Sequence, residues 1–399
     1  MADVKPLTLS EQDFVKENEM ADPAQLLLQG NRFRHLPLKE LVHYIQARQK
    51  IKQKLPLWYQ NLAIVYPQTL SLEQSSSEIT AAFKADLVEG NILFDLTGGF
   101  GIDSYFFSKK IKQVIYVERH PELAAVAAYN SRILGANNIA FNTEDAGEFL
   151  KTYSGTADWI YLDPARRDNR NQKVHRLEDC EPDVLGLLPL LFSKGKNILL
   201  KTSPMLDINQ AIQDLQQVHK IYVIALENEC KEVLYHLTAA AGTNPDIETH
   251  NILTNNKTQY FGFAYADEEN IPVSYSLPQT YIYEPNAAIL KAGGFKSVAQ
   301  AYGLNKLHRN SHLYTSDNLV SNFPGRIFRL KNICRYHKKE LLLQLPEKKA
   351  NITVRNFPDT VAQIRAKTGL KEGGQHYLFA TTDLNQKPVI LICEKVISV

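Results

Sequence analysis

The stretch Phe94-Asp95-Leu96-Thr97-Gly98-Gly99-Phe100-Gly101-Ile102-Asp103 decides the fold of this 399-residue chain. It joins an apolar run, predicted as a strand over residues 91–96, to a predicted helix over residues 102–110. Glycines let the backbone turn tightly and approach a ligand, and the start of the following helix offers free N–H groups. In an open α/β sheet such a loop lies at the carboxyl ends of the strands, where ligands bind. We therefore expect a ligand-binding loop at this position.

Short apolar strands continue to alternate with helices after this loop. The predicted strands cover residues 113–118, 138–142, 158–162 and 197–201, and the predicted helices cover residues 121–134, 146–153, 182–193 and 207–217. Two more predicted strands, 219–227 and 232–238, follow one another with no helix between them. Strand–helix repeats that end in a strand pair predict an α/β fold with a seven-stranded, mostly parallel, Rossmann-like sheet and an antiparallel hairpin at its edge.

The character of the sequence changes on both sides of this core. Helix-start signals and helical spacing of apolar residues predict a helical N-terminal domain over residues 1–75. The sheet domain is expected over residues 76–250, followed by small α+β modules over residues 251–325 and 326–399. In these modules we expect a helix that is interrupted at Gly293-Gly294, and a strand over residues 341–345.

Several classes of protein are disfavoured by what the sequence lacks. No apolar run approaches the ~18 residues that cross a bilayer, and the first residues show no secretory signal. The cysteines stand far apart without a C-x-x-C pair, which argues against a disulfide framework and a structural zinc site. They are Cys180, Cys230, Cys334 and Cys393. A reduced, cytoplasmic protein without a membrane or metal partner is the expectation.

The formal net charge of +2 conceals a separation of charge along the chain. Residues 92–285 carry 17 basic and 25 acidic side chains, whereas residues 286–349 carry 12 basic and 3 acidic ones. The second segment, with a net charge of +9, also contains interleaved aromatic residues. Cations mixed with aromatics suit phosphate contact and base stacking, so we expect this basic segment to contact RNA. A solvated surface is the alternative.

Charged and polar residues stand at the ends of successive predicted strands. Glu118, Asp145 and Asp163 end the second, third and fourth strands, and Lys201-Thr202-Ser203-Pro204 ends the fifth. A dinucleotide-binding fingerprint would need a third glycine where Ser104 stands, which disfavours a Rossmann dehydrogenase.

With the glycine loop and these strand-end residues in this order, residues 75–240 resemble class I S-adenosylmethionine (SAM) methyltransferases. The first motif of that family, (D/E)-x-x-x-G-x-G, is similar to Asp95–Gly101. More narrowly, the chain resembles a bacterial family that joins such a domain to a small ferredoxin-like module and a C-terminal THUMP-like domain, which binds RNA. The C-terminal resemblance runs through Phe323-Pro324-Gly325-Arg326 and the α/β pattern that follows. It implies SAM as the cofactor and a SAM methyltransferase sheet of seven strands.

The resemblance also implies roles for individual residues. Glu118 is expected to bind the ribose hydroxyls of SAM, since a carboxylate accepts both hydrogen bonds, and Asp145 the adenine amino group. The full cofactor-binding set is Asp95, Thr97, Gly98, Gly99, Gly101, Asp103, Glu118, Arg119, Asp145 and Ala146. The catalytic set is Asp163, Pro164, Arg166 and Arg167.

The catalytic motif departs from the D-P-P-(Y/F/W) of enzymes that methylate exocyclic amines of bases. Asp163 and the Pro164 carbonyl can still accept N–H bonds from an amine, but Ala165 and Arg166 replace the second proline and the aromatic residue. The guanidinium groups of Arg166 and Arg167 either stack on the base or form structural ion pairs. The basic segment 166–176 is either a loop that touches RNA phosphates or an ordinary solvated loop.

Methylation of a pyrimidine carbon is the less favoured reaction, because it needs a cysteine nucleophile. The fifth strand end carries none, and Cys180 stands in an acidic stretch that disfavours its thiolate. The sequence therefore predicts a SAM-dependent methyltransferase that acts on rRNA or tRNA, with a base nitrogen as the expected methyl acceptor. The alternatives are a methyltransferase of a small molecule or protein, and a non-catalytic protein that binds SAM and RNA. The oligomeric state is left open.

Overall fold

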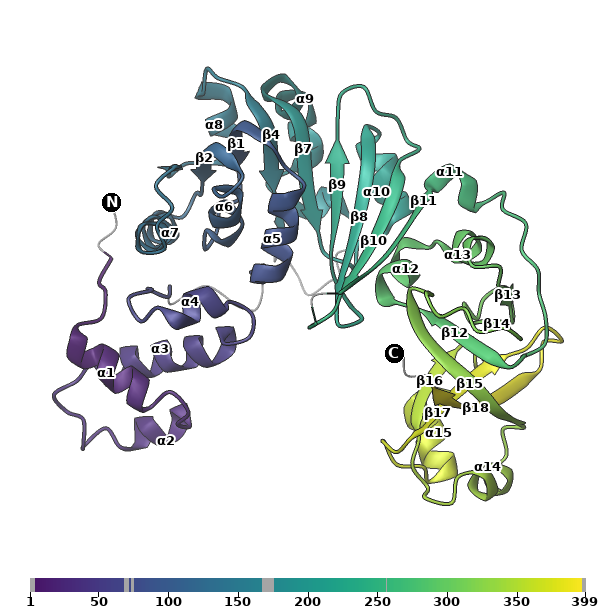
Figure 1. The fold of residues 1–399 in the computed structure, drawn as a ribbon. Coiled ribbons are helices and arrows are strands. Elements are labelled where there is room, and N and C mark those ends of the chain that lie inside the picture. Colours follow the sequence, from purple (N-terminus) through teal and green to yellow (C-terminus); the bar gives the residue numbers. More distant parts are fainter. Residues whose placement is uncertain (1–3, 68–71, 73–74, 167–175, 256, 397–399) are drawn as a thin grey trace. The chain divides into compact units, whose positions relative to one another are not determined.

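The computed structural model describes residues 4–67, 72, 75–166, 176–255 and 257–396 of the chain. The chain forms two compact units, and Figure 1 traces the helices and strands along the sequence. The first consists of Met1–Gln217 with Tyr235–Ala241, and the second of Val218–Leu234 with Gly242–Val399. Within the described residues, no helix is long and apolar enough to cross a membrane.

Helices form the start of the first unit, as the sequence predicts. They are α1 (Leu9–Glu17), α2 (Pro23–Leu28), α3 (Leu38–Ile51), α4 (Pro56–Gln60) and α5 (Glu78–Asp86). Thr8 caps α1 in a capping box with Glu11, and the Ser77 hydroxyl caps α5. The sequence signals for helix starts therefore work through ordinary capping chemistry.

These helices pack on the sheet domain and share a hydrophobic core with it. The rings of Trp58 and Tyr105 meet edge to face at 5.1 Å between centroids. The Asn130 side chain exchanges two hydrogen bonds of 2.9 Å with the backbone of Val65. Aromatic packing and a satisfied buried amide fix the helices relative to the glycine loop.

A large sheet carries the predicted alternation of strands and helices. Its elements in chain order are β1 (Gly90–Asp95), α6 (Ile102–Phe107), β2 (Ile111–Val117), α7 (Pro121–Ile133), β3 (Ile139–Asn142), α8 (Ala146–Thr152), β4 (Ala157–Leu162), α9 (Val184–Lys194), β7 (Gly195–Thr202), α10 (Ile208–Leu215), β8 (Val218–Leu226) and β9 (Glu229–Leu237). The strand order begins β3-β2-β1-β4-β7-β9-β8, and the first five of these strands are parallel to one another. The Rossmann-like α/β fold is confirmed.

The sheet has nine strands, because two more extend it beyond the predicted seven. β10 (Asp246–Ile252) runs parallel to β8 over its whole length, and β11 (Thr258–Ala264) runs antiparallel to β10. The prediction of the β8–β9 hairpin at the edge is therefore wrong. A bare β8 would expose a row of unpaired backbone groups, and β10 satisfies them. β11 lies beyond residue 250, in the stretch that the sequence suggests for the next module.

The second unit contains a seven-stranded sheet of order β13-β14-β12-β15-β18-β17-β16. Its strands are β12 (Tyr281–Pro285), β13 (Asn305–Lys306), β14 (Tyr314–Ser316), β15 (Gly325–Cys334), β16 (Asn351–Arg355), β17 (His376–Thr382) and β18 (Pro388–Lys395). Its helices are α11 (Tyr265–Glu268), α12 (Ala287–Ala292), α13 (Phe295–Ala301), α14 (Lys338–Gln344) and α15 (Val361–Thr368). The buried carboxylate of Glu284 pairs with Arg326 and Arg355, which joins three strands of this sheet.

Two expectations for this region have different outcomes. The helix break at Gly293-Gly294 is confirmed, because Gly293 ends α12 in the left-handed conformation with φ +81°. The strand over residues 341–345 is wrong, because α14 covers most of this stretch. Leu341 is buried whereas Leu343 is 81% exposed, so a helix buries one face of this leucine run. A short apolar run does not distinguish a strand from a helix.

Candidate active site

The glycine loop lies between β1 and α6, as the sequence predicts. Gly99 and Gly101 have φ angles of +54° and +80°, which favour glycine. Gly98 is required for a different reason, since a Cβ there would lie 2.1 Å from the ring of Tyr116. The Tyr116 hydroxyl donates to the Gly99 carbonyl over 2.6 Å. The ring therefore fills the space below the loop and fixes its path.

Asp95 lies beneath this loop and holds it in place. Its carboxylate accepts hydrogen bonds from the Thr97 backbone N–H and from the Ser104 hydroxyl. The residue is 1% exposed and does not line the cavity described below. Burial raises the pKa of Asp95 to about 7, with a further contribution from the nearby Asp103. Asp95 therefore orders the loop from below.

A cavity of about 250 Å³ opens above the loop. All the other predicted cofactor residues line it: Thr97, Gly98, Gly99, Gly101, Asp103, Glu118, Arg119, Asp145 and Ala146. Asp163 from the catalytic set also lines it, together with Ser75, Ser76 and Glu181. Residues from four strand ends thus meet at one cavity, because the carboxyl ends of parallel strands share one edge of the sheet.

Hydrogen bonds fix the acidic side chains of this cavity. The Glu118 carboxylate accepts from the backbone N–H groups of Gly99, over 3.0 Å, and His120, over 2.9 Å. Asp145 caps α8, with the Gly147 N–H at 2.8 Å from Oδ1. Each oxygen has two lone pairs, so these carboxylates keep acceptor capacity for a ligand.

Asp163 follows β4 and is tied to both the glycine loop and β7. Its backbone N–H donates to the Thr97 hydroxyl over 2.6 Å, and its carboxylate forms an ion pair with Lys201 at the end of β7. The Asp163 side chain is 34% exposed, whereas that of Lys201 is 11% exposed. The Asp163 carboxylate is therefore fixed by the ion pair with Lys201 and partly accessible at the edge of the cavity.

The other predicted catalytic residues lie elsewhere. Pro164 lines a second, smaller cavity of about 50 Å³ together with Lys201 and Cys180. Arg166 belongs to the short strand β5 (Ala165–Arg166), which pairs with β6 (Cys180–Glu181). Arg167 and most of the segment 166–176 lie outside the described residues. No disulfide links the cysteines.

Three residues near the cavity were not among the site residues predicted from the sequence. Ser76 precedes α5, Lys84 lies in α5, and the Tyr161 hydroxyl comes from β4. All three contact Asp103, as Ser76 and Tyr161 donate over 2.9 and 2.8 Å and Lys84 forms an ion pair of 3.2 Å. No local sequence pattern distinguishes these residues.

The basic segment 286–349 is less free than its net charge suggests. Lys306 is buried, Arg326 is paired with Glu284, and Lys331 is paired with Glu394. Besides Lys331, the exposed cations of this segment are Arg309, Arg329, Arg335, Lys338, Lys339, Lys348 and Lys349. The described residues contain no group of three side chains that would hold a metal ion.

Asp95 predicts a specific pH dependence of stability. Its pKa of about 7 in the folded protein lies above the ordinary 3.8, so the folded state binds a proton that the unfolded state releases. This stabilisation is present at low pH and is lost as the pH rises through 7. Between pH 5 and 8 we expect the free energy of unfolding of the wild type to fall relative to that of Asp95→Asn by about 3 kcal/mol, because the slope of about 1.4 kcal/mol per pH unit levels off above pH 7. Urea unfolding of both proteins at several pH values measures this difference in free energy. Parallel pH curves for the two proteins would contradict the prediction.

Comparisons with known proteins identify relatives of the whole chain and of its C-terminal domains. Family models match a ferredoxin-like domain at residues 281–324 and a THUMP domain-like region at residues 325–395, which confirms the predicted C-terminal resemblance. The crystal structure of a candidate methyltransferase from Porphyromonas gingivalis W83 is similar over 98% of both chains, with 35% identity and a TM-score of 0.86.

Two curated relatives match shorter stretches. An uncharacterized RNA methyltransferase of Thermotoga maritima is 34% identical over 110 residues, which are 27% of this chain and 25% of that protein. The 23S rRNA (uracil(1939)-C(5))-methyltransferase RlmD of Shewanella amazonensis is 36% identical over 83 residues, which are 20% of this chain and 19% of that protein. The chain thus spans a quarter or less of the length of these curated relatives.

Proposed function

Because this chain belongs to the same family as the candidate methyltransferase of Porphyromonas gingivalis, we propose that it is a SAM-dependent methyltransferase that acts on rRNA or tRNA. One observation carries the proposal. The glycine loop, Glu118 and Asp145 line one cavity, and Asp163 lies at its edge. A cofactor cradle and a candidate catalytic carboxylate therefore meet at the same place.

The residues of the cavity fit the parts of SAM. Glu118 would accept hydrogen bonds from the ribose hydroxyls, and Asp145 with Ala146 would contact the adenine. The glycine loop and Asp103 would hold the methionine end, since a loop without side chains lets the backbone approach closely. When bound, SAM supplies a methyl group on a positively charged sulfur. The protein then has to orient the nucleophile and exclude water.

A base nitrogen is the proposed methyl acceptor. The Asp163 carboxylate and the Pro164 carbonyl would accept hydrogen bonds from the N–H groups and so aim the nitrogen lone pair at the methyl carbon. The new nitrogen–carbon bond forms as the carbon–sulfur bond breaks, and the electron pair of that bond stays on sulfur. The nitrogen then loses a proton to solvent. Asp163 needs only to align the nitrogen for this reaction.

The RNA would dock on the second unit. The exposed cations of the segment 286–349 suit phosphate contact, and all of them except Arg309 lie within the THUMP domain-like match at residues 325–395. Both curated relatives are RNA methyltransferases by name. A reduced, cytoplasmic setting belongs to the same proposal.

A second candidate reaction is methylation of a pyrimidine at C5. Cys180 lines the small cavity that Pro164 and Lys201 also line, close to the proposed catalytic motif. A thiolate there would add to C6 of the pyrimidine, C5 would take the methyl group, and loss of the C5 proton would release the thiolate. The Shewanella relative is named as a uracil C5 enzyme.

Replacement of Cys180 separates the two reactions. For a nitrogen acceptor, we expect Cys180→Ser to keep the methyl transfer rate within about threefold, because the thiol takes no part. Loss of at least about 10³-fold in rate would establish the C5 reaction, because the covalent step would be missing. The measurement is transfer of a labelled methyl group to RNA, with Cys230→Ser as the matched control.

Cofactor binding is tested directly by calorimetry. The purified protein is expected to bind SAM, or its demethylated product, with one site per chain. Absence of heat for both ligands, in protein whose fold is intact by circular dichroism, would refute the proposed function.

A further inference from the structure

We infer that Lys201 is a positioning residue that holds Asp163 for methyl transfer, and that it is itself anchored by a buried network reaching Ser76, Lys84 and Asp103. The inference rests on the proposed function. It gives Lys201 a role in the reaction, whereas the sequence pattern places this residue only at the end of the fifth predicted strand.

The first part of the network joins Lys201 to Asp163. The Lys201 ammonium pairs with Asp163 Oδ2 and lies 3.4 Å from the Ser76 hydroxyl oxygen. Lys201 is 9% exposed as a residue, so water screens this charge pair only weakly. A buried ammonium that holds one carboxylate oxygen restricts the rotation of the carboxylate, and the 34% exposure of the Asp163 side chain leaves part of it accessible to a substrate.

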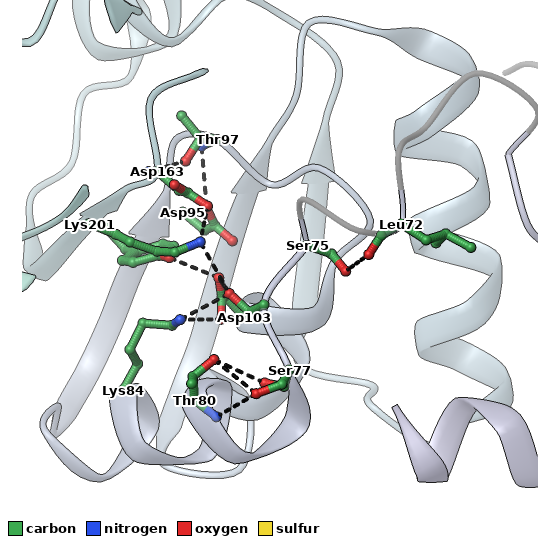
Figure 2. A network of polar contacts seen from close by, with 12 residues as sticks. Leu72, Ser75, Ser77, Thr80, Lys84, Asp95, Thr97, Asp103, Asp163 and Lys201 are labelled. Atoms are coloured by element: carbon green, nitrogen blue, oxygen red, sulfur yellow. Dashed lines mark hydrogen bonds and ion pairs between the residues drawn. The ribbon is translucent and has the colours of Figure 1, made fainter. Parts of the chain in front are cut away.

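The second part anchors Lys201 from the opposite side. The Ser76 hydroxyl donates to Asp103 and accepts a hydrogen bond of 2.9 Å from Lys84, whose side chain is fully buried. Figure 2 shows Lys84 and Lys201 converging on Asp103 from two directions, with Asp163 and Asp95 above. Burial alone would raise the pKa of Asp103, but Lys84 and Lys201, with hydrogen bonds from Tyr161 and Ser76, lower it. Asp103 is thus kept ionised as a fixed counter-charge.

The charges explain why two lysines are needed here. Asp103 and Asp163 both lie close enough to Asp95 to raise the pKa of its carboxyl, so the three side chains form one acidic cluster. Without Lys201, Asp163 would turn away from this cluster toward solvent. With Lys201 in place, its carboxylate is neutralised and held, which makes it a fixed hydrogen-bond acceptor for the substrate nitrogen.

Asp103 gives the network a link to the cofactor. It lines the cavity above the glycine loop, and Asp163 lines the same cavity. The Ser76 hydroxyl contacts both Asp103 and the ammonium that holds Asp163. The same rigid group of side chains therefore supports the proposed cofactor site and the proposed catalytic carboxylate.

Three variants test the role of Lys201. Lys201→Gln keeps a polar group next to Ser76 but removes the charge, Lys201→Arg keeps the charge, and Lys196→Gln removes an exposed lysine from the same strand. We expect Lys201→Gln to lower kcat for RNA methylation by about 100-fold, because a catalytic group that is displaced by about 1 Å costs a factor of this size. The Kd of SAM should stay within about threefold, and Lys201→Arg should recover at least tenfold in kcat.

The outcomes decide between positioning and a merely structural role. In the Lys201→Gln/Asp163→Asn double variant, kcat should be no lower than in the worse of the single variants, because both act on one carboxylate. A wild-type kcat in Lys201→Gln would overturn the inference. A loss of SAM binding in proportion to the loss of kcat would also overturn it. The same holds if Lys201→Arg recovers none of the lost kcat. Absence of RNA methylation by the wild type would instead refute the proposed function.

Discussion

Replacement of Asp163 by alanine is expected to leave SAM binding intact and to slow RNA methylation by at least about 100-fold. The Thr97 hydroxyl accepts a hydrogen bond from the backbone N–H of Asp163, and alanine at this position keeps that N–H group. The glycine loop should therefore keep its shape, and the Kd of SAM should stay within about threefold. The carboxylate that aligns the base nitrogen is lost, and correct alignment accounts for a large part of the rate in such reactions. Calorimetry and single-turnover methyl transfer measure the two effects separately.

A control residue in the same strand makes this test specific. Asp158 near the start of β4 pairs with Lys196, and its carboxylate accepts from the Asn91 backbone N–H over 2.8 Å. Asp158→Ala is expected to lower stability and to leave kcat unchanged, because Asp158 lies far along the strand from the cavity-lining Asp163. A wild-type rate in Asp163→Ala would remove Asp163 from the mechanism.

The second large effect is expected at Gly98. A Cβ on this residue would lie 2.1–2.5 Å from three atoms of the Tyr116 ring, which is fully buried between the loop and Phe141. The ring cannot move away, so the loop must shift. Overpacking of this kind costs about 1–3 kcal/mol, and the same shift displaces the backbone that would hold the methionine end of SAM. We expect Gly98→Ala to raise the Kd of SAM by about 10–100-fold.

Gly242→Ala serves as the matched control for this substitution. A Cβ at Gly242 meets nothing within 4 Å, and its backbone does not need the left-handed conformation. It should leave SAM affinity and stability unchanged. If Gly98→Ala binds SAM as tightly as Gly242→Ala does, the loop is not the cofactor cradle that we propose.

Local sequence patterns predicted the sheet well, because its strands are buried runs bounded by glycines, prolines and helix caps. The strand-end acids could also be brought together, since parallel strands place their carboxyl ends at one edge. The same pattern did not show that Asp95 lies beneath the loop while Glu118 and Asp145 line the cavity. That distinction depends on how the loop passes over Ser104 and Tyr116, which is a matter of packing.

Long-range polar contacts were beyond the sequence. Ser76 and Lys201 are 125 residues apart, and neither carries a local motif that indicates the contact. The strand prediction for the leucine run at residues 341–345 was wrong for a related reason. Only tertiary packing decides which of these side chains are buried. Likewise, the local sequences of β10 and β11 do not specify that β10 pairs with β8 and β11 with β10.

Transfer of a labelled methyl group from SAM to RNA shows whether the protein is an RNA methyltransferase. The purified protein should label RNA isolated from a deletion strain, and should label little of the parent strain's RNA, whose target is already methylated. Nucleoside mass spectrometry should then find one methylated nucleoside in the labelled RNA that the deletion strain lacks. If neither RNA is labelled and the two strains contain the same methylated nucleosides, the protein is not an RNA methyltransferase.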